Sequence, residues 1–345
     1  MCYLVYMPRK ARIDAPGALH HIICRAIAKS KLYLDEKDRH AFLKRLEKIL
    51  TDTNTPCYAW ALMPNHFHLL LRTGIVPIST IMSRLLTGYA IYHNRRHNRQ
   101  GHLFQNRYKS ILCQENKYLL ELVRYIHLNP LRGKLVKDIA HLDKYPYCGH
   151  SAILGNTGNS WQEIDKILAL FHDKRYLALR FYKNFVKKGV AQGRRSDLVG
   201  GGLVRSVGGW SALISMRQAK NYQKGDERIL GDGDFVEQTL KAADEAMERK
   251  SALRAQGFDL DKIALRVADL LEMDTAKVWA SGRYHHIVRA RSLLCYWAVR
   301  ELGTSMALLS RRLNISIPAV SKSVVRGEKI ARDMNYKLLV YKVNK

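Results

Sequence analysis

The sequence predicts an α+β domain with a ferredoxin-like βαββαβ core and one added helix, followed by a mostly α-helical region that ends in a helix-turn-helix. Three observations predict this arrangement: strand and helix patterns that alternate over the first 130 residues, a hairpin signal between two strand patterns, and helical periodicity near the C-terminus. A chain of 345 residues is too long for one compact core of typical size. We expect a first domain over 1–150, a helical connector with a glycine-rich linker over 151–250, and a helical DNA-binding domain over 251–345.

The elements of the first domain follow the order β-α-β-β-α-β-α. β-branched and apolar residues predict the first strand, and Asp35 then opens a pattern with apolar residues at helical spacing. The two middle strands are joined by Met63-Pro64-Asn65, which is a hairpin signal. The expected elements are a strand over 18–25, a helix over 35–50, strands over 57–62 and 66–72, a helix over 78–95, a strand over 108–113 and the added helix over 115–130.

The connector contains a mixed, mainly helical stretch over 131–190 and then clustered glycines over 189–209, including Gly200-Gly201-Gly202. A loop that binds phosphate would need a GK[ST] or a GxGxxG motif after a strand, and neither occurs here. The glycines therefore favour a flexible linker.

The last hundred residues carry amphipathic helical patterns over 258–271 and 286–302. The segment MALLSRRLNISIPAVSKSVVRGEKI then indicates a helix, a short turn and a second helix. In a helix-turn-helix the start of the second helix meets base edges in the major groove. We expect Ser321 and Lys322 there, with Arg326 nearby. A plain helical hairpin is the alternative.

The charge of the chain points to a polyanionic partner. Lys and Arg number 58 against 30 Asp and Glu, which gives a formal net charge of +28. Basic residues outnumber acidic ones both in 1–150 and in 151–345, so a single basic tail does not explain the charge. No apolar run approaches the ~20 residues of a membrane span. We therefore expect nucleic acid, and no membrane, as the partner.

The six cysteines form no CxxC motif and no zinc-finger spacing. Scattered single cysteines are typical of buried, reduced residues in a cytoplasmic protein. The start of the sequence lacks the pattern of a signal peptide, which also predicts a cytoplasmic location.

Two histidines, His66 and His68, stand two apart on a predicted strand and thus face the same side. The pair alone is weak evidence for a metal site. On the added helix, Tyr125 and Asn129 stand four apart and share a face. If that face packs beside the histidines, two imidazoles and an amide oxygen could hold a divalent cation, and the Tyr125 hydroxyl would point at the phosphate bound to it.

Tyrosine is a suitable nucleophile because its phosphodiester conserves the energy of the broken bond, so the cut strand can be rejoined without ATP. Tyr118 and Tyr108 are alternatives to Tyr125, since Tyr118 lies on roughly the same helix face and Tyr108 on the neighbouring strand. Only Tyr125 has a polar residue four positions later that could be a ligand.

The strand LMPNHFHLLL, the segment GHLFQNRYKS and the helix LLELVRYIHLNPLRGKLV together resemble the REP-associated tyrosine transposases, which belong to the HUH class of nucleases. The resemblance runs from about Pro8 to Pro146. It implies that His66, His68 and Asn129 are ligands of a divalent metal, Mg²⁺ or Mn²⁺, and that Tyr125 is catalytic. Members of this family cut single-stranded DNA beside a hairpin, keep the 5′ phosphate on the tyrosine and release a 3′ hydroxyl.

Residues 256–332 are similar, more loosely, to the duplex-binding helical domain of the bacterial replication initiator. This resemblance implies recognition of duplex DNA, with Arg289 and Arg291 as phosphate contacts. The chain has no Walker loop, so replication initiation itself is not implied.

Together these observations predict a transposase-like, metal-dependent single-stranded DNA endonuclease that nicks and rejoins DNA at hairpin-forming repeats through a 5′-phosphotyrosine intermediate. The expected partners are single-stranded or hairpin DNA and, through the C-terminal domain, duplex DNA. The alternative is a sequence-specific DNA-binding regulator that keeps the nuclease fold as a hairpin-binding module. The sequence leaves open whether the protein is a homodimer whose active site is shared between two chains.

Overall fold

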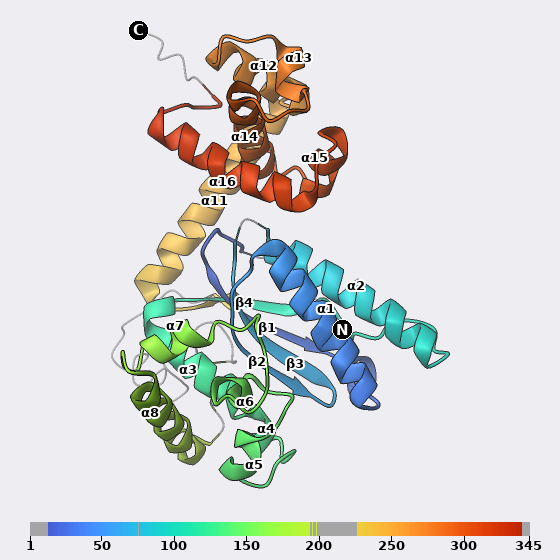
Figure 1. The fold of residues 1–345 in the computed structure, drawn as a ribbon, viewed down its shortest axis with the longest axis vertical. Coiled ribbons are helices and arrows are strands. Elements are labelled where there is room, and N and C mark those ends of the chain that lie inside the picture. Colours follow the sequence, from blue (N-terminus) through green and yellow to red (C-terminus); the bar gives the residue numbers. More distant parts are fainter. Residues whose placement is uncertain (1–12, 75, 194, 196–197, 199–225, 340–345) are drawn as a thin grey trace, which may run out of the picture. The chain divides into compact units, whose positions relative to one another are not determined.

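The computed structural model describes residues 13–74, 76–193, 195, 198 and 226–339 (Figure 1). The chain divides into two compact units, Met1–Leu240 and Lys241–Lys345. Within the described residues, no helix is both long and apolar enough to span a membrane. The expected boundaries at residues 150 and 250 stay a prediction.

The first unit is built on a mixed sheet with the strand order β2-β3-β1-β4-β5. Its first four strands are antiparallel neighbours, in the order of a ferredoxin-like sheet. The short fifth strand pairs in parallel with β4. The elements from the start of the described chain to the fourth strand are β1 (Leu19–Arg25), the 3-10 turn η1 (Ile27–Lys29), α1 (Glu36–Thr53), β2 (Cys57–Met63), β3 (His66–Arg72), α2 (Ile78–Arg96) and β4 (Lys109–Cys113).

Helices cover both faces of this sheet. Phe42 of α1 packs against Phe67 of β3 with ring centroids 4.9 Å apart, so α1 and its neighbour α2 cover the face that Phe67 points to. The helix α3 (Glu115–His127) covers the other face with Leu122, Val123 and Ile126, which are fully buried (Figure 1). Because side chains alternate along β3, His66 and His68 belong to the face covered by α3.

The sequence prediction of a βαββαβ core with an added helix, followed by a helical region, is confirmed. The added helix differs in one respect, because it is divided into α3 and α4 (Asn129–Arg132). Pro130 has no N–H and cannot bond to the carbonyl of Ile126, which removes one bond of the helical ladder. Leu128 between the two pieces keeps right-handed helical dihedral angles, so Tyr125 and Asn129 remain about one turn apart.

Further helices follow α4, and one of them, α8, contacts α3. The elements that follow α4 along the chain are α5 (Ile139–Asp143), α6 (Gly149–Ile153), α7 (Ile164–Ala169), α8 (Arg175–Lys188), the 3-10 turn η2 (Val190–Gln192) and β5 (Ile229–Leu230). Most of the predicted glycine-rich linker over 189–209 lies outside the described residues.

The second unit is helical. The helix α11 (Gly233–Ala255) begins in the first unit and ends in the second. The remaining helices are α12 (Leu260–Leu270), α13 (Thr275–Trp279), α14 (His285–Arg300), α15 (Met306–Arg312) and α16 (Ile317–Asp333). A turn over 313–316 separates α15 from α16, and the Ser316 hydroxyl caps α16 by accepting the N–H of Ala319. Whether this pair binds DNA as a helix-turn-helix stays a prediction.

The close contact between α14 and α16 depends on Gly327. A Cβ atom at this position would lie 2.0 Å from the backbone oxygen of Ser292, which cannot move aside without moving α14. We expect Gly327→Ala to lower the free energy of unfolding of this unit by about 1–3 kcal/mol, as overpacking of a tight core does. Denaturant unfolding followed by circular dichroism measures the change. Lys329→Ala, an exposed substitution on the same helix, is the control, and equal stabilities of the two variants would contradict the prediction.

Candidate active site

Two imidazoles from β3 form the first half of the candidate site. His66 and His68 stand on the same face of the strand, and their ring centroids are 5.1 Å apart. The hairpin turn places His66 at the end of β3, where it is partly exposed, whereas His68 is only 4% exposed. The pair therefore lies at the edge of the core, with one ring open to solvent.

The second half comes from α3 and α4. The ring of Tyr125 meets that of His68 edge to face, with centroids 6.0 Å apart. Asn129 begins α4 and is 9% exposed. All four side chains predicted from the sequence line one pocket of about 450 Å³, so the expected packing of the added helix against the histidine face occurs.

The rest of this pocket is polar and positively charged. Its other lining residues are Ile23, Arg25, Gln105, Asn106, Arg107 and Lys109. Three of them are cationic and none carries a carboxylate, which favours an anionic ligand such as a DNA phosphate. Arg25, Arg107 and Lys109 were not predicted from the sequence, because they lie on three separate segments, namely β1, the loop before β4 and β4.

Both histidines have hydrogen-bond partners at Nδ1. Asn65 Oδ1 accepts a hydrogen bond from His66 Nδ1 at 2.7 Å. His68 Nδ1 lies 3.0 Å from His21 Nε2 on the neighbouring strand β1, so one of these two nitrogens donates to the other. With Nδ1 used in this way, Nε2 of each ring remains as the nitrogen that could bind a metal. No pattern in the sequence indicates the contact between His21 and His68.

Burial keeps both imidazoles neutral. It lowers the pKa of His66 from 6.5 to about 4, with a smaller contribution from the Arg25 guanidinium. Burial also lowers the pKa of His68 well below 6.5, and the neighbouring His21, His66 and Arg25 act in the same direction. A neutral imidazole is the form that ligates metals. The residues therefore fit the divalent cation that the sequence resemblance implies, with Asn129 able to supply an oxygen.

Tyr125 is the tyrosine best placed for chemistry. Tyr108 and Tyr118, the two alternatives from the sequence, are not among the residues that line the pocket. Tyr108 is 7% exposed, and Tyr118 packs against the core beneath α3.

An arginine that was not predicted from the sequence, Arg132, lies beside Tyr125. The guanidinium carbon of Arg132 is 5.6 Å from the centroid of the Tyr125 ring. Its Nη2 donates to the carbonyl of Gly189, while its Nε and Nη1 are buried without a hydrogen-bond partner among the described residues. Arg132 follows Tyr125 by seven residues, which is two helical turns, and this spacing could have indicated the neighbourhood.

His127 lies away from the pocket. It is fully buried, and its Nδ1 is 2.8 Å from the hydroxyl of Tyr182 on α8, which also lies 2.7 Å from Nδ1 of His150. His127 therefore links α3 to the helices packed on it.

In the second unit, Arg289 and Arg291 of α14 and Arg326 of α16 line one pocket of about 860 Å³. Arg283 and His285 line it as well, together with one acidic residue, Asp333. Ser321 and Lys322 are not among its lining residues, so the five residues predicted to contact duplex DNA do not all meet at one place.

The comparisons with known proteins concern mainly the first unit. Residues 16–129 match the family model described as "Transposase IS200 like". No curated protein gives a significant match. The family match ends before the second unit, so the resemblance of residues 256–332 to a replication initiator domain stays a prediction.

Two solved structures are similar to this chain. One is a REP-associated tyrosine transposase bound to a REP hairpin, with 16% identity and a TM-score of 0.37 over 46% of this chain and 98% of that one. The other is a putative transposase from Deinococcus radiodurans R1, with 21% identity and a TM-score of 0.26 over 34% of this chain and 95% of that one. The residues that match the IS200-like transposase model, 16–129, include all four predicted active-site residues.

Proposed function

We propose that this transposase cuts and rejoins single-stranded DNA beside a hairpin, with Tyr125 as the nucleophile and a divalent cation held by His66, His68 and Asn129. The observation that carries the proposal is that these four side chains line one cationic pocket. The alternative regulator would need a hairpin-binding surface but not two neutral imidazoles beside a tyrosine. The site therefore favours the enzyme.

In the proposed reaction the Tyr125 oxygen attacks the phosphorus of the scissile phosphodiester. A phosphotyrosine bond forms, the bond between phosphorus and the 3′ oxygen breaks, and the 3′ oxygen leaves as a hydroxyl after taking up a proton. Attack by a 3′ hydroxyl on the phosphotyrosine reverses these bond changes and rejoins a strand. A bound divalent cation would polarise the phosphoryl oxygen as a Lewis acid.

The residues of the chain have distinct roles in this scheme. His66, His68 and Asn129 would hold the divalent cation that orients the phosphate, and Arg25, Arg107 and Lys109 attract the strand into the pocket. Arg132 offers the N–H groups of two nitrogens, Nε and Nη1, beside the Tyr125 ring, where negative charge develops on the phenolic oxygen and the phosphate.

We infer Mg²⁺ or Mn²⁺ as the cation, with Mn²⁺ the stronger binder, since imidazole suits Mn²⁺ better than the harder Mg²⁺. The proposed DNA partner is a hairpin with a single-stranded flank, by analogy with the REP hairpin bound to the similar transposase.

The experiment that tests the function uses the full chain and a labelled hairpin oligonucleotide with single-stranded flanks. With Mg²⁺ or Mn²⁺, denaturing gels should reveal a cleaved strand and a covalent protein–DNA adduct. Excess chelator should abolish both products and leave binding, measured by fluorescence anisotropy. Binding without cleavage under every cation condition would favour the regulator.

For the second unit we propose duplex binding through the arginines of the 860 Å³ pocket. The observation that favours it is the grouping of Arg289, Arg291 and Arg326 from two helices around one concave surface. Ser321 and Lys322 are proposed to contact bases at the start of α16.

We expect Arg289→Ala combined with Arg326→Ala to weaken binding of the full chain to long duplex DNA. Each lost phosphate contact should also reduce the slope of log K against log salt by about one unit. Anisotropy titrations at several salt concentrations measure both effects. Lys329→Ala removes one positive charge from α16 at a position outside the pocket, so it is the control for the loss of a single charge. Duplex binding by the arginine variant that equals the control would remove this pocket from the duplex site.

A further inference from the structure

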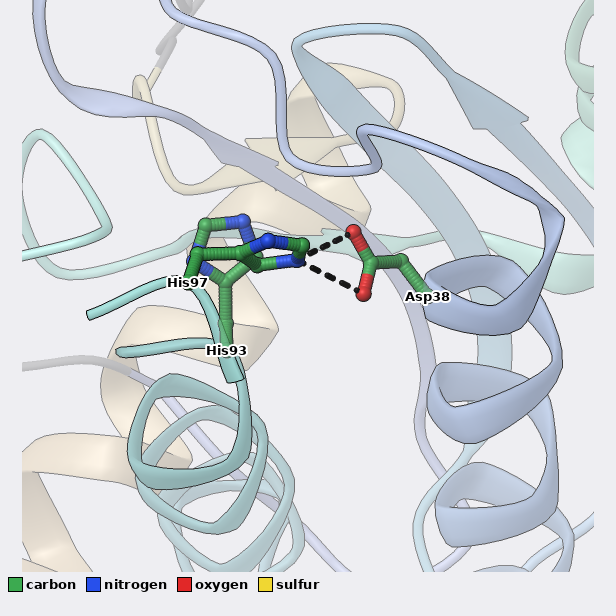
Figure 2. A group of neighbouring side chains, drawn as sticks. All are labelled: Asp38, His93 and His97. Atoms are coloured by element: carbon green, nitrogen blue, oxygen red, sulfur yellow. Dashed lines mark hydrogen bonds and ion pairs between the residues drawn. The ribbon is translucent and has the colours of Figure 1, made fainter. Parts of the chain in front are cut away.

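We propose a second metal site, of the zinc-binding type, formed by Asp38, His93 and His97. The two histidines stand four apart at the C-terminal end of α2 and share a face, while Asp38 faces them from α1 (Figure 2). One ligand atom from each of the three residues lies within 4.8 Å of the other two. The helices α1 and α2 cover the face of the sheet opposite to His66 and His68, so this cluster is separate from the candidate active site.

His93 is the observation that points to a ligand. It is only 2% exposed, yet neither of its ring nitrogens has a hydrogen-bond partner among the described residues. Buried polar groups nearly always have a partner. The other histidines buried in the described part of the chain each have a hydrogen bond, namely His20, His21, His68, His127 and His150. A bound cation would give one of the two ring nitrogens of His93 a partner.

The geometry between Asp38 and His97 already suits a shared ion. His97 Nε2 lies 3.1 and 3.0 Å from the two carboxylate oxygens of Asp38 (Figure 2). Ligand atoms around tetrahedral zinc are separated by roughly 3.3 Å, given Zn–N and Zn–O bonds of about 2.0–2.1 Å. Small rotations of the three side chains would therefore place their ligand atoms around one ion.

The protonation states also suit a metal. Burial lowers the pKa of His93, which keeps its ring neutral. Burial alone would raise the pKa of Asp38, but hydrogen bonds from the Leu34 N–H, His97 and Arg96 lower it below 3.8, so the carboxylate is charged. Of these donors, the Leu34 N–H and Arg96 would remain as outer hydrogen bonds of a ligating carboxylate, whereas His97 would ligate with the proton on its other ring nitrogen.

The charges around the cluster do not oppose a cation strongly. Arg96 forms ion pairs with both Asp38 and Asp35. Arg99 is the other nearby cation, and it lowers the pKa of His93 only as a minor cause. Two carboxylates, Asp35 and Asp38, thus balance the two guanidiniums near the cluster.

The donor set selects the metal. Two imidazoles and one carboxylate, with a fourth position for water, are the ligands that Zn²⁺ binds in tetrahedral geometry. Mg²⁺ prefers oxygen ligands and would compete poorly. A zinc ion here would tie α1 to the end of α2 and fix the start of the segment over 97–108, whose far end supplies Gln105, Asn106 and Arg107 to the candidate active site.

The test uses the full chain carrying His66→Ala and His68→Ala, so that metal at the candidate active site is not counted. After loading with Zn²⁺ and dialysis in the presence of Mg²⁺, we expect about one zinc ion per chain by mass spectrometry. Co²⁺ in place of zinc should give the visible absorption of a tetrahedral site. Zinc should also raise the thermal midpoint by about 5 °C.

Adding His93→Ala should remove the retained zinc, the cobalt spectrum and the thermal shift together. Adding His141→Ala is the matched control, because His141 forms an exposed pair with Asp138 and should leave all three unchanged. If His93→Ala does not fold, His97→Gln tests the same ligand set at the end of the helix. The proposal is overturned if the background protein retains no zinc, or if a folded His93 or His97 variant retains as much as the control.

Discussion

Tyr125→Phe is expected to abolish the covalent protein–DNA adduct while leaving hairpin binding nearly unchanged. The substitution removes the phenolic oxygen that becomes bonded to phosphorus. No other residue that lines the pocket carries a hydroxyl group that could replace it. The ring that packs edge to face against His68 remains, so the shape of the pocket is kept. Denaturing gels measure the adduct, and fluorescence anisotropy measures binding.

The matched controls for this prediction are Tyr118→Phe and Tyr108→Phe. Each removes one hydroxyl from the same neighbourhood of the fold, but neither side chain lines the pocket. Both variants should form the adduct at rates close to that of the unchanged protein. An adduct that persists in Tyr125→Phe and disappears in one of the controls would transfer the nucleophile to that tyrosine.

His68→Ala is expected to reduce the cleavage rate by at least about 100-fold at a fixed concentration of Mg²⁺ or Mn²⁺. Losing only an outer partner of a metal ligand already costs about 10–100-fold in metal affinity or activity. Loss of the ligand itself should cost more, because two ligands from the chain would remain. A single-turnover assay with a labelled hairpin oligonucleotide, repeated over a range of cation concentrations, measures the effect.

A graded series sharpens this result. His21→Ala removes the partner of His68 Nδ1 but no proposed ligand. The cleavage rate should therefore fall less than in His68→Ala, and a higher cation concentration should restore part of it. His141→Ala should have no effect on cleavage, because His141 does not line the pocket and forms an exposed pair with Asp138. Equal cleavage by His68→Ala and His141→Ala, or full cleavage in excess chelator, would show that the histidine pair is structural and does not hold a catalytic metal.

The family match leaves two points for these experiments to decide, namely the nucleophile and the catalytic metal. Residues 16–129 match the IS200-like transposase model, whereas the chemistry at Tyr125 and the metal at His66, His68 and Asn129 are proposals that the two variants test directly. The zinc-type cluster at Asp38, His93 and His97 is independent of both, because it is measured in a protein without the histidine pair.

Local patterns in the sequence were enough to predict the order of elements in the first unit. Strand and helix patterns have different periods, and the Met63-Pro64-Asn65 turn fixes where β2 reverses into β3. The same local logic put His66 with His68, and Tyr125 with Asn129, on shared faces. The division of the added helix into α3 and α4 also follows from the missing N–H of Pro130, although the sequence predicted a single helix over 115–130.

Contacts between distant segments needed the tertiary structure. Three contacts depend on how the strands pair and how α3 and α4 pack on the sheet. The helix α3 covers the histidine face, His21 lies beside His68 although 47 residues separate them, and Arg132 lies over the ring of Tyr125. Asp38 and His97 likewise meet across 59 residues through the packing of α1 on α2. Periodicity in the sequence determines which side of a strand or helix a residue occupies. The packing of the whole core decides which elements face each other, and it brought these side chains together.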